Sequence, residues 1–171
     1  MNAPRTELII RDAVEEDVAS ILRILNYEIV HSTSLYEYDE RTLEFQLHWF
    51  RNKKEHNWPV VVAELNGNVV GLGTFGTFRE RIAYRFTVEH SIYISSEAQN
   101  AGIGKSLMME LIRLAKEGGY HSMIGGIDAN NEGSIRFHEK FGFMEVARMR
   151  EVGFKFDCWL DLVFMQLILE H

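Results

Sequence analysis

Apolar positions along the chain follow two spacings, which predict alternating strands and helices. Helical spacing predicts helices over residues 12–30, 42–54, 105–116 and 131–141. Alternating or continuous apolar runs predict strands over residues 7–11, 59–65, 69–78, 89–94, 121–128, 144–151 and 159–169. This order predicts an α/β fold with one mixed sheet and helices on both faces.

Local signals set some of the expected boundaries. Asp12 followed by Glu15 is a capping-box pattern, so the first helix is expected to begin there. Asn66-Gly67 predicts a tight hairpin turn, and Gly153–Cys158 is expected to be a loop between the last two strands. Residues 31–39, which are polar and aromatic, are also expected to form a loop.

The stretch from Glu89 to Ser106 predicts a strand, a glycine-rich turn and the start of a helix. Gly102 and Gly104 would let a ligand approach the backbone closely. The first N–H groups of a helix have no partner within the helix, so they can bind an anion. The stretch therefore predicts a phosphate-binding turn.

Three known phosphate-binding patterns share features with this turn. A nucleoside-triphosphate loop fits Gly104-Lys105-Ser106, but Gln99 stands where its first glycine belongs. A dinucleotide-binding turn lacks its third glycine, because Leu107 occupies that position. The pattern Gln/Arg-x-x-Gly-x-Gly/Ala is matched in full by Gln99, Gly102 and Gly104.

Composition limits the class of protein. The chain has 171 residues and a formal net charge of -7, which predicts one domain over residues 1–171 and argues against nucleic acid as a partner. The single cysteine excludes an intrachain disulfide and is compatible with a reducing compartment. No apolar run is long enough to span a bilayer, so we expect a cytoplasmic protein without a membrane partner.

The glycine turn resembles the acetyl-CoA pyrophosphate loop of the GCN5-related N-acetyltransferases (GNAT). A second motif runs from Asn131 through Ser134 and His138 to Gly142-Phe143, and His138 stands where many members have a tyrosine. Longer stretches resemble the phosphinothricin and methionine sulfoximine N-acetyltransferases of that superfamily. These stretches are residues 31–34, 78–81, 84–94, 138–139, 150–156 and 159–161.

The resemblance implies a GNAT fold with a single mixed, mostly antiparallel sheet that is splayed at the central strand. It implies acetyl-CoA as cosubstrate and no metal. It also implies a small amino acid acceptor and a homodimer paired through the C-terminal region. It assigns acetyl-CoA contacts to Ile92, Tyr93, Ile94, Gln99, Asn100, Ala101, Gly102, Ile103, Gly104, Lys105, Ser106, Asn131 and Ser134. The backbone N–H of Ile94 or a neighbour would stabilise the oxyanion.

Two residues are the expected catalytic groups. Glu89, at the start of the central strand, matches the family carboxylate that takes the acceptor's proton; the alternative is a solvated strand-end glutamate. His138 would protonate the departing thiolate or act as a second base, and the alternative is a hydrogen-bonded structural histidine. His90 should face the opposite side of the strand from Glu89 and is expected to be structural.

The acceptor side is expected around Arg79, Arg81 and Arg85, because guanidinium groups suit a carboxylate and a tetrahedral polar group. At least one of these arginines is expected to be a surface residue only. Tyr36 would line the acceptor pocket or pack as a loop anchor.

Several alternatives remain open on the sequence. An acetyltransferase for a polyamine, an aminoglycoside or a protein N-terminus, and a non-catalytic acyl-CoA-binding module, would share these motifs. A nucleoside-triphosphate enzyme is a more distant alternative. Residues 128–139 approach a calcium-loop pattern, but the expected strand before them argues against it.

Overall fold

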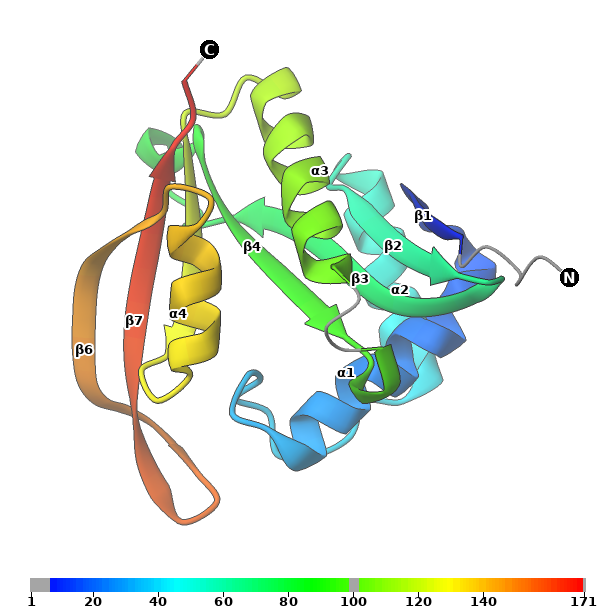
Figure 1. Ribbon diagram of the computed structural model, residues 1–171, viewed down its shortest axis with the longest axis horizontal. Coiled ribbons are helices and arrows are strands. Elements are labelled where there is room, and N and C mark those ends of the chain that lie inside the picture. Colours follow the sequence, from blue (N-terminus) through cyan, green and yellow to red (C-terminus); the bar gives the residue numbers. More distant parts are fainter. Residues whose placement is uncertain (1–6, 99–101, 171) are drawn as a thin grey trace, which may run out of the picture. The chain divides into compact units, whose positions relative to one another are not determined.

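The computed structural model describes residues 7–98 and 102–170. The strands are β1 (Leu8–Asp12), β2 (Val60–Leu65), β3 (Asn68–Thr77), β4 (Thr87–Ile94), β5 (Ser122–Asp128), β6 (Met144–Lys155) and β7 (Cys158–Ile168) (Figure 1). The helices are α1 (Val18–His31), α2 (Leu43–Glu55), α3 (Ile103–Glu117) and α4 (Glu132–Glu139), with 3-10 turns η1 (Glu15–Asp17), η2 (Ile82–Tyr84) and η3 (Ser96–Ala98).

The strands form one mixed sheet in the order β1-β2-β3-β4-β5-β7-β6. The pairs β1–β2, β2–β3, β5–β7 and β6–β7 are antiparallel, and β4–β5 is parallel. This confirms the expected mixed, mostly antiparallel sheet. The β4–β5 pairing covers Thr87–Glu89 of β4, although β4 continues to Ile94.

The chain groups into two compact units. The first comprises Met1–Tyr27, Arg41–Phe75 and Ser91–Leu111. Its core contains the β2 residues Val60, Val61, Val62 and Ala63, which are at most 1% exposed. Gly73 lets α3 approach β3, because a Cβ on Gly73 would lie 3.1 Å from the side chain of Leu111.

The second unit comprises Glu28–Glu40, Gly76–His90 and Ile112–His171. It contains the long hairpin of β6 and β7 and the helix α4 (Figure 1). β7 also pairs with β5 from Ser122 to Asp128, so β5 is held by a strand that follows it in sequence. No helix among the described residues is long and apolar enough to cross a bilayer.

Two expected boundaries were wrong. The first helix begins at Val18 after η1, and the carboxylate of Asp17, rather than an Asp12–Glu15 box, accepts the Val14 N–H at 2.9 Å. The expected loop at residues 153–158 is mostly strand, because β6 and β7 are joined directly at Phe156-Asp157. Both turn residues have positive φ, 53° and 57°, which suits a type I′ turn.

Candidate functional site

The glycine turn opens α3, as expected. Gly102 has a φ of +73°, which favours glycine, and α3 begins at the next residue. The Ser106 N–H already bonds the Gly102 carbonyl at 3.2 Å, so the earlier N–H groups of the first turn are the ones available to an anion. Gly104 and Lys105 lie in this turn, and Lys105 is exposed. Gln99, Asn100 and Ala101 lie outside the described residues.

The end of β4 is fixed against β3 and α3. Ser95 N–H donates to the Val70 carbonyl at 2.8 Å. A Cβ on Gly71 would lie 3.2 Å from Ile103 and 3.3 Å from the Tyr93 carbonyl, so Gly71 lets the start of α3 sit close to the sheet. Ile92, Tyr93 and Ile94 are half-buried here, in the same unit as the start of α3.

Glu89 lies half-buried on β4, where it pairs in register with Ile124 of β5, and its carboxylate lies beside Gly126. A Cβ on Gly126 would lie 3.3 Å from Glu89 Oε1 and 3.6 Å from both Leu162 and Phe164. Gly126 itself is exposed, so a small molecule can reach the backbone beside the carboxylate. Burial raises the pKa of Glu89, and the positive charge of Arg79 opposes that rise. A carboxylate with a raised pKa is a stronger base.

The expected arginines differ in their surroundings, although all three are exposed. The Arg79 guanidinium carbon lies 5.2 Å from the centre of the Phe78 ring, and its charge acts on Glu89. Arg85 stacks on Phe86 at 4.4 Å, and Arg81 precedes η2. Of the three, Arg79 is therefore the one whose charge is felt by the candidate base.

Aromatic rings surround this face of the unit. Phe78 meets Phe164 edge-to-face at 6.1 Å and Tyr84 at 5.9 Å. Phe164 pairs with Gly126 in register between β5 and β7. The face that bears Glu89 thus combines an exposed glycine, a carboxylate, a cation and apolar rings, which suits a small acceptor with both polar and apolar parts.

His138 lies on the other face of β5, paired with His90. The Nε2 atoms of the two rings are 3.1 Å apart, and His138 Nδ1 is 2.7 Å from the Ser134 carbonyl. A Cβ on Gly125 would lie 2.9 Å from His90 Nε2 and 3.1 Å from His138 Nε2. Since Gly125 and Gly126 are adjacent in a strand, their faces are opposite. His138 and Glu89 are therefore not brought together.

The hydrogen bonds fix how protons are distributed on the two rings. His138 Nδ1 must donate to the Ser134 carbonyl, so His138 Nε2 accepts from His90 Nε2–H. His90 Nδ1 is then a buried acceptor without a hydrogen-bond partner in the part of the chain that the structure describes. Burial lowers the pKa of both histidines, to about 3 for His90. Sequence reasoning placed His90 on the correct face but missed its bond to His138, because that contact joins β4 to α4.

The remaining second-motif residues form the start of α4. Asn131 Oδ1 accepts the Ser134 N–H at 3.0 Å, which caps the helix. Ser134 is half-buried and provides the carbonyl that orients His138. Among the described residues, no group of three or more side chains is arranged to hold a metal ion.

The loop after α1 lies against β5 and the β6–β7 hairpin. Thr33 Oγ1 donates to the carboxylate of Asp128, and the Tyr36 ring packs on Gly153, where a Cβ would lie 2.6 Å away. Burial raises the pKa of Tyr36, and the charges of Asp128 and Asp161 add to the rise. Sequence reasoning did not place Gly126, Thr33 or Asp128 in the site. Thr33 lies in the stretch 31–34 that resembles the family, and Asp128 begins the calcium-loop pattern, but neither signal indicates a place near Glu89.

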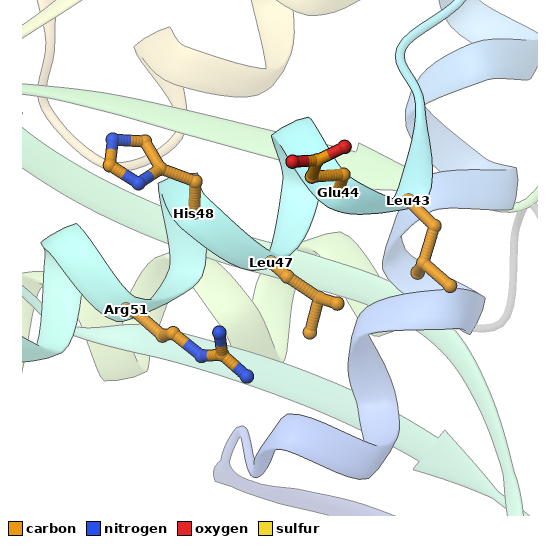
Figure 2. A pocket seen from close by; sticks show the side chains of 5 residues that line it. All are labelled: Leu43, Glu44, Leu47, His48 and Arg51. Atoms are coloured by element: carbon orange, nitrogen blue, oxygen red, sulfur yellow. The ribbon is translucent and has the colours of Figure 1, made fainter.

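A separate hollow of about 400 Å³ lies along α2 (Figure 2). It is lined by Leu43, Glu44, Leu47, His48 and Arg51. Arg51 is paired with Glu15 at 2.6 Å. No residue of this hollow was expected in the site from sequence.

Comparison with known proteins places the chain among acetyltransferases. Residues 22–143 match the model of the Acetyltransferase (GNAT) family. The chain is 40% identical over 164 residues to an L-methionine sulfoximine/L-methionine sulfone acetyltransferase of Salmonella typhimurium, and the match covers 95% of each protein.

Solved structures agree with this match. An N-acetyltransferase from Staphylococcus aureus superimposes with a TM-score of 0.95 at 43% identity, over 96% of this chain and 99% of the other. A phosphinothricin acetyltransferase of the GNAT superfamily from Sinorhizobium meliloti, solved with acetyl-CoA, gives 0.91 at 37% identity, over 95% and 88%.

Proposed function

The chain belongs to the acetyltransferase (GNAT) family, and we propose that it transfers an acetyl group from acetyl-CoA to the α-amino group of a small amino acid analogue. Methionine sulfoximine, methionine sulfone and phosphinothricin are the acceptor types we expect. The observation that carries the proposal is the half-buried carboxylate of Glu89, which faces the exposed Gly126 and lies within the influence of Arg79. The names of two relatives support the same acceptor class.

Acetyl-CoA is the cosubstrate, as in the related structure solved with it. We assign its pyrophosphate to the N–H groups around Gly102 and the first turn of α3, where the backbone is open and the helix dipole favours an anion. The same assignment covers Lys105 and Ser106, together with Gln99–Ala101, which lie outside the described residues. The pantetheine arm and thioester would follow Ile92–Ile94, Asn131 and Ser134.

The proposed reaction begins with loss of a proton from the acceptor's ammonium group to Glu89. The neutral amine attacks the thioester carbonyl, and the tetrahedral oxyanion is stabilised by the backbone N–H of Ile94 or a neighbour. The C–S bond then breaks, the attacking nitrogen loses its second proton, and the CoA thiolate takes one proton, so that one proton leaves to solvent over the whole reaction. The raised pKa of Glu89 supports its role as the base.

His138 remains our candidate proton donor to the thiolate. In the neutral pair its Nε2 lone pair is occupied by His90, so donation requires a proton on the His138 ring. Burial lowers the pKa of His138, which favours the neutral ring, so any such proton is held weakly and readily given up.

Arg79 and Arg81 support an acceptor that carries a carboxylate or another polar anionic group. The test is competitive turnover of methionine sulfoximine and spermidine at equal concentration, with thiol release as the readout. We expect sulfoximine to be preferred, and Arg79→Ala to weaken that preference more than Arg85→Ala. Preference for spermidine would favour the polyamine alternative, and acetyl-CoA binding without turnover on any amine would favour a binding module.

We further propose that the protein forms a cytoplasmic homodimer. Support comes from the β6–β7 hairpin, where Phe154, Phe156 and Trp159 are 44%, 53% and 62% exposed. Light scattering at micromolar concentration should give twice the chain mass, and Trp159→Ser should weaken the association. The net charge of -7 argues against nucleic acid as a partner.

A further inference from the structure

Lys155 is a buried lysine whose ammonium group is bound by main-chain carbonyls. It ends β6, and the residue is 2% exposed. Its Nζ donates to the carbonyl oxygens of Ile29 at 2.7 Å, Ser32 at 2.8 Å and Leu35 at 2.6 Å. An ammonium group has three N–H donors, so these bonds use all of them. Since lysine is rarely buried, this arrangement calls for a specific explanation.

The three carbonyls belong to the end of α1 and to the segment after it. Ile29 lies in the last turn of α1, where carbonyls have no helical N–H partner and a cation is favoured by the helix dipole. Ser32 and Leu35 lie beyond the helix. By holding these groups around one ammonium, Lys155 sets the path of the chain where it leaves α1.

Other contacts hold the same segment, residues 31–39, which we call the 31–39 loop. Thr33 donates to Asp128, and the Tyr38 hydroxyl donates to the Phe154 carbonyl. The Tyr36 ring packs on Gly153. The loop is thus tied to β5 at one point and to the hairpin at the others.

The attachment at Asp128 brings the loop to the face that bears Glu89. Asp128 and Gly126 are two residues apart in β5, so their side-chain positions share a face and lie about 7 Å apart. Gly126 is the residue opposite the Glu89 carboxylate. The 31–39 loop therefore lies next to the position that we assign to the acceptor's amino group.

We propose that Lys155 is a positioning residue for the acceptor: it holds the 31–39 loop as a wall of the acceptor site and does not touch the acceptor itself. The proposal rests on the proposed function. Methionine at position 155 would fill similar volume but leave three carbonyls without a donor. Those carbonyls would turn towards water, and the loop would lose its fixed path.

The test compares Lys155→Met and Thr33→Val, which each remove one attachment of the loop, with Lys116→Met as a control for an exposed lysine. Steady-state rates are measured with methionine sulfoximine varied at saturating acetyl-CoA, and the reverse. We expect kcat/KM for the acceptor to fall about 10- to 100-fold in Lys155→Met and less in Thr33→Val. The KM for acetyl-CoA should stay within about twofold of wild type, as should all constants of the control.

Hydrogen exchange separates this proposal from the acceptor assignment, because it needs no acceptor. Amides of residues 30–36 should exchange faster in Lys155→Met, while those of α3 should not change. If the wild type prefers another amine, the proposed acceptor class is wrong. The kinetics of Lys155→Met are then measured with that amine as the acceptor.

Three results would overturn the role of Lys155. They are equal losses for both substrates, faster loop exchange with wild-type acceptor kinetics, and unchanged loop exchange. If Lys155→Met does not fold, Thr33→Val decides by the same criteria.

Discussion

Replacing Glu89 with glutamine tests the assigned base with little disturbance of the fold. The two side chains have nearly the same shape, and the facing residue, Gly126, has no side chain that could clash. Glutamine cannot take a proton from an ammonium group. The change therefore removes the base without creating a cavity.

The size of the effect follows from the role. A positioned general base contributes about 10²- to 10⁴-fold to a rate, so kcat should fall by that factor. At about 1.36 kcal/mol per tenfold, the barrier rises by roughly 3–5 kcal/mol. Affinity for acetyl-CoA should hardly change, because in the proposed reaction Glu89 handles the acceptor's proton.

The assay is thiol release as a function of pH. Because burial raises the pKa of Glu89, activity of the wild type should fall as pH drops through that raised pKa, and this acid limb should vanish in the variant. The loss should also shrink at high pH, where more acceptor is already neutral. Wild-type turnover by the variant across the pH range would refute the assignment and leave Glu89 a structural residue.

Three further substitutions probe other parts of the site. Gly104→Val should weaken acetyl-CoA binding at least about tenfold in titration calorimetry, because a branched side chain would stand where phosphate approaches the backbone. Unchanged affinity would contradict the assignment of the pyrophosphate to this turn. Arg79→Ala removes a charge that lowers the pKa of Glu89, so the acid limb of the pH–activity profile should move to higher pH. An acid limb at the wild-type pH would contradict an influence of Arg79 on Glu89. Gly125→Ala should cost about 1–3 kcal/mol in thermal unfolding, because its Cβ would press on two histidine rings. Gly133→Ala should cost less, because its Cβ would meet only Asn131 Oδ1 at an ordinary contact distance of 3.7 Å; equal effects would argue against tight packing at Gly125.

The helices and strands with strong apolar periodicity could be predicted from the sequence. The exact start of the first helix and the length of the last hairpin turn could not. The strand before the glycine turn and the helix after it followed from apolar spacing and glycine positions. The loop expected at residues 153–158 was too long, because Phe156-Asp157 lacks the glycine that most often marks a two-residue hairpin turn. The start of α1 was misplaced because the carboxylate of Asp17 forms a salt bridge with Arg11, at 2.7 Å, and accepts the Val14 N–H.

Contacts that depend on strand pairing could not be predicted from the sequence either. Glu89 and His138 each matched a motif, but only the register of β4 and β5 shows that they lie on opposite faces. From the sequence, Gly125 and Gly126 indicate only a strand. In the structure Gly125 leaves room for the rings of two histidines, and Gly126 lies beside the Glu89 carboxylate. Lys155 lies in the resembling stretch 150–156, but its buried role could not be predicted, because its three partners lie more than 100 residues earlier in the chain.

The reaction we propose is acetyl transfer to the α-amino group of a small amino acid analogue. Its most direct test is incubation of the protein with acetyl-CoA carrying a ¹³C-labelled acetyl group and methionine sulfoximine, followed by NMR of the product. We predict that the labelled carbonyl appears in an amide at the α-nitrogen, in step with release of free CoA, and that Glu89→Gln slows both together. Label that stays on CoA, or that enters only a polyamine supplied beside the sulfoximine, would contradict the account.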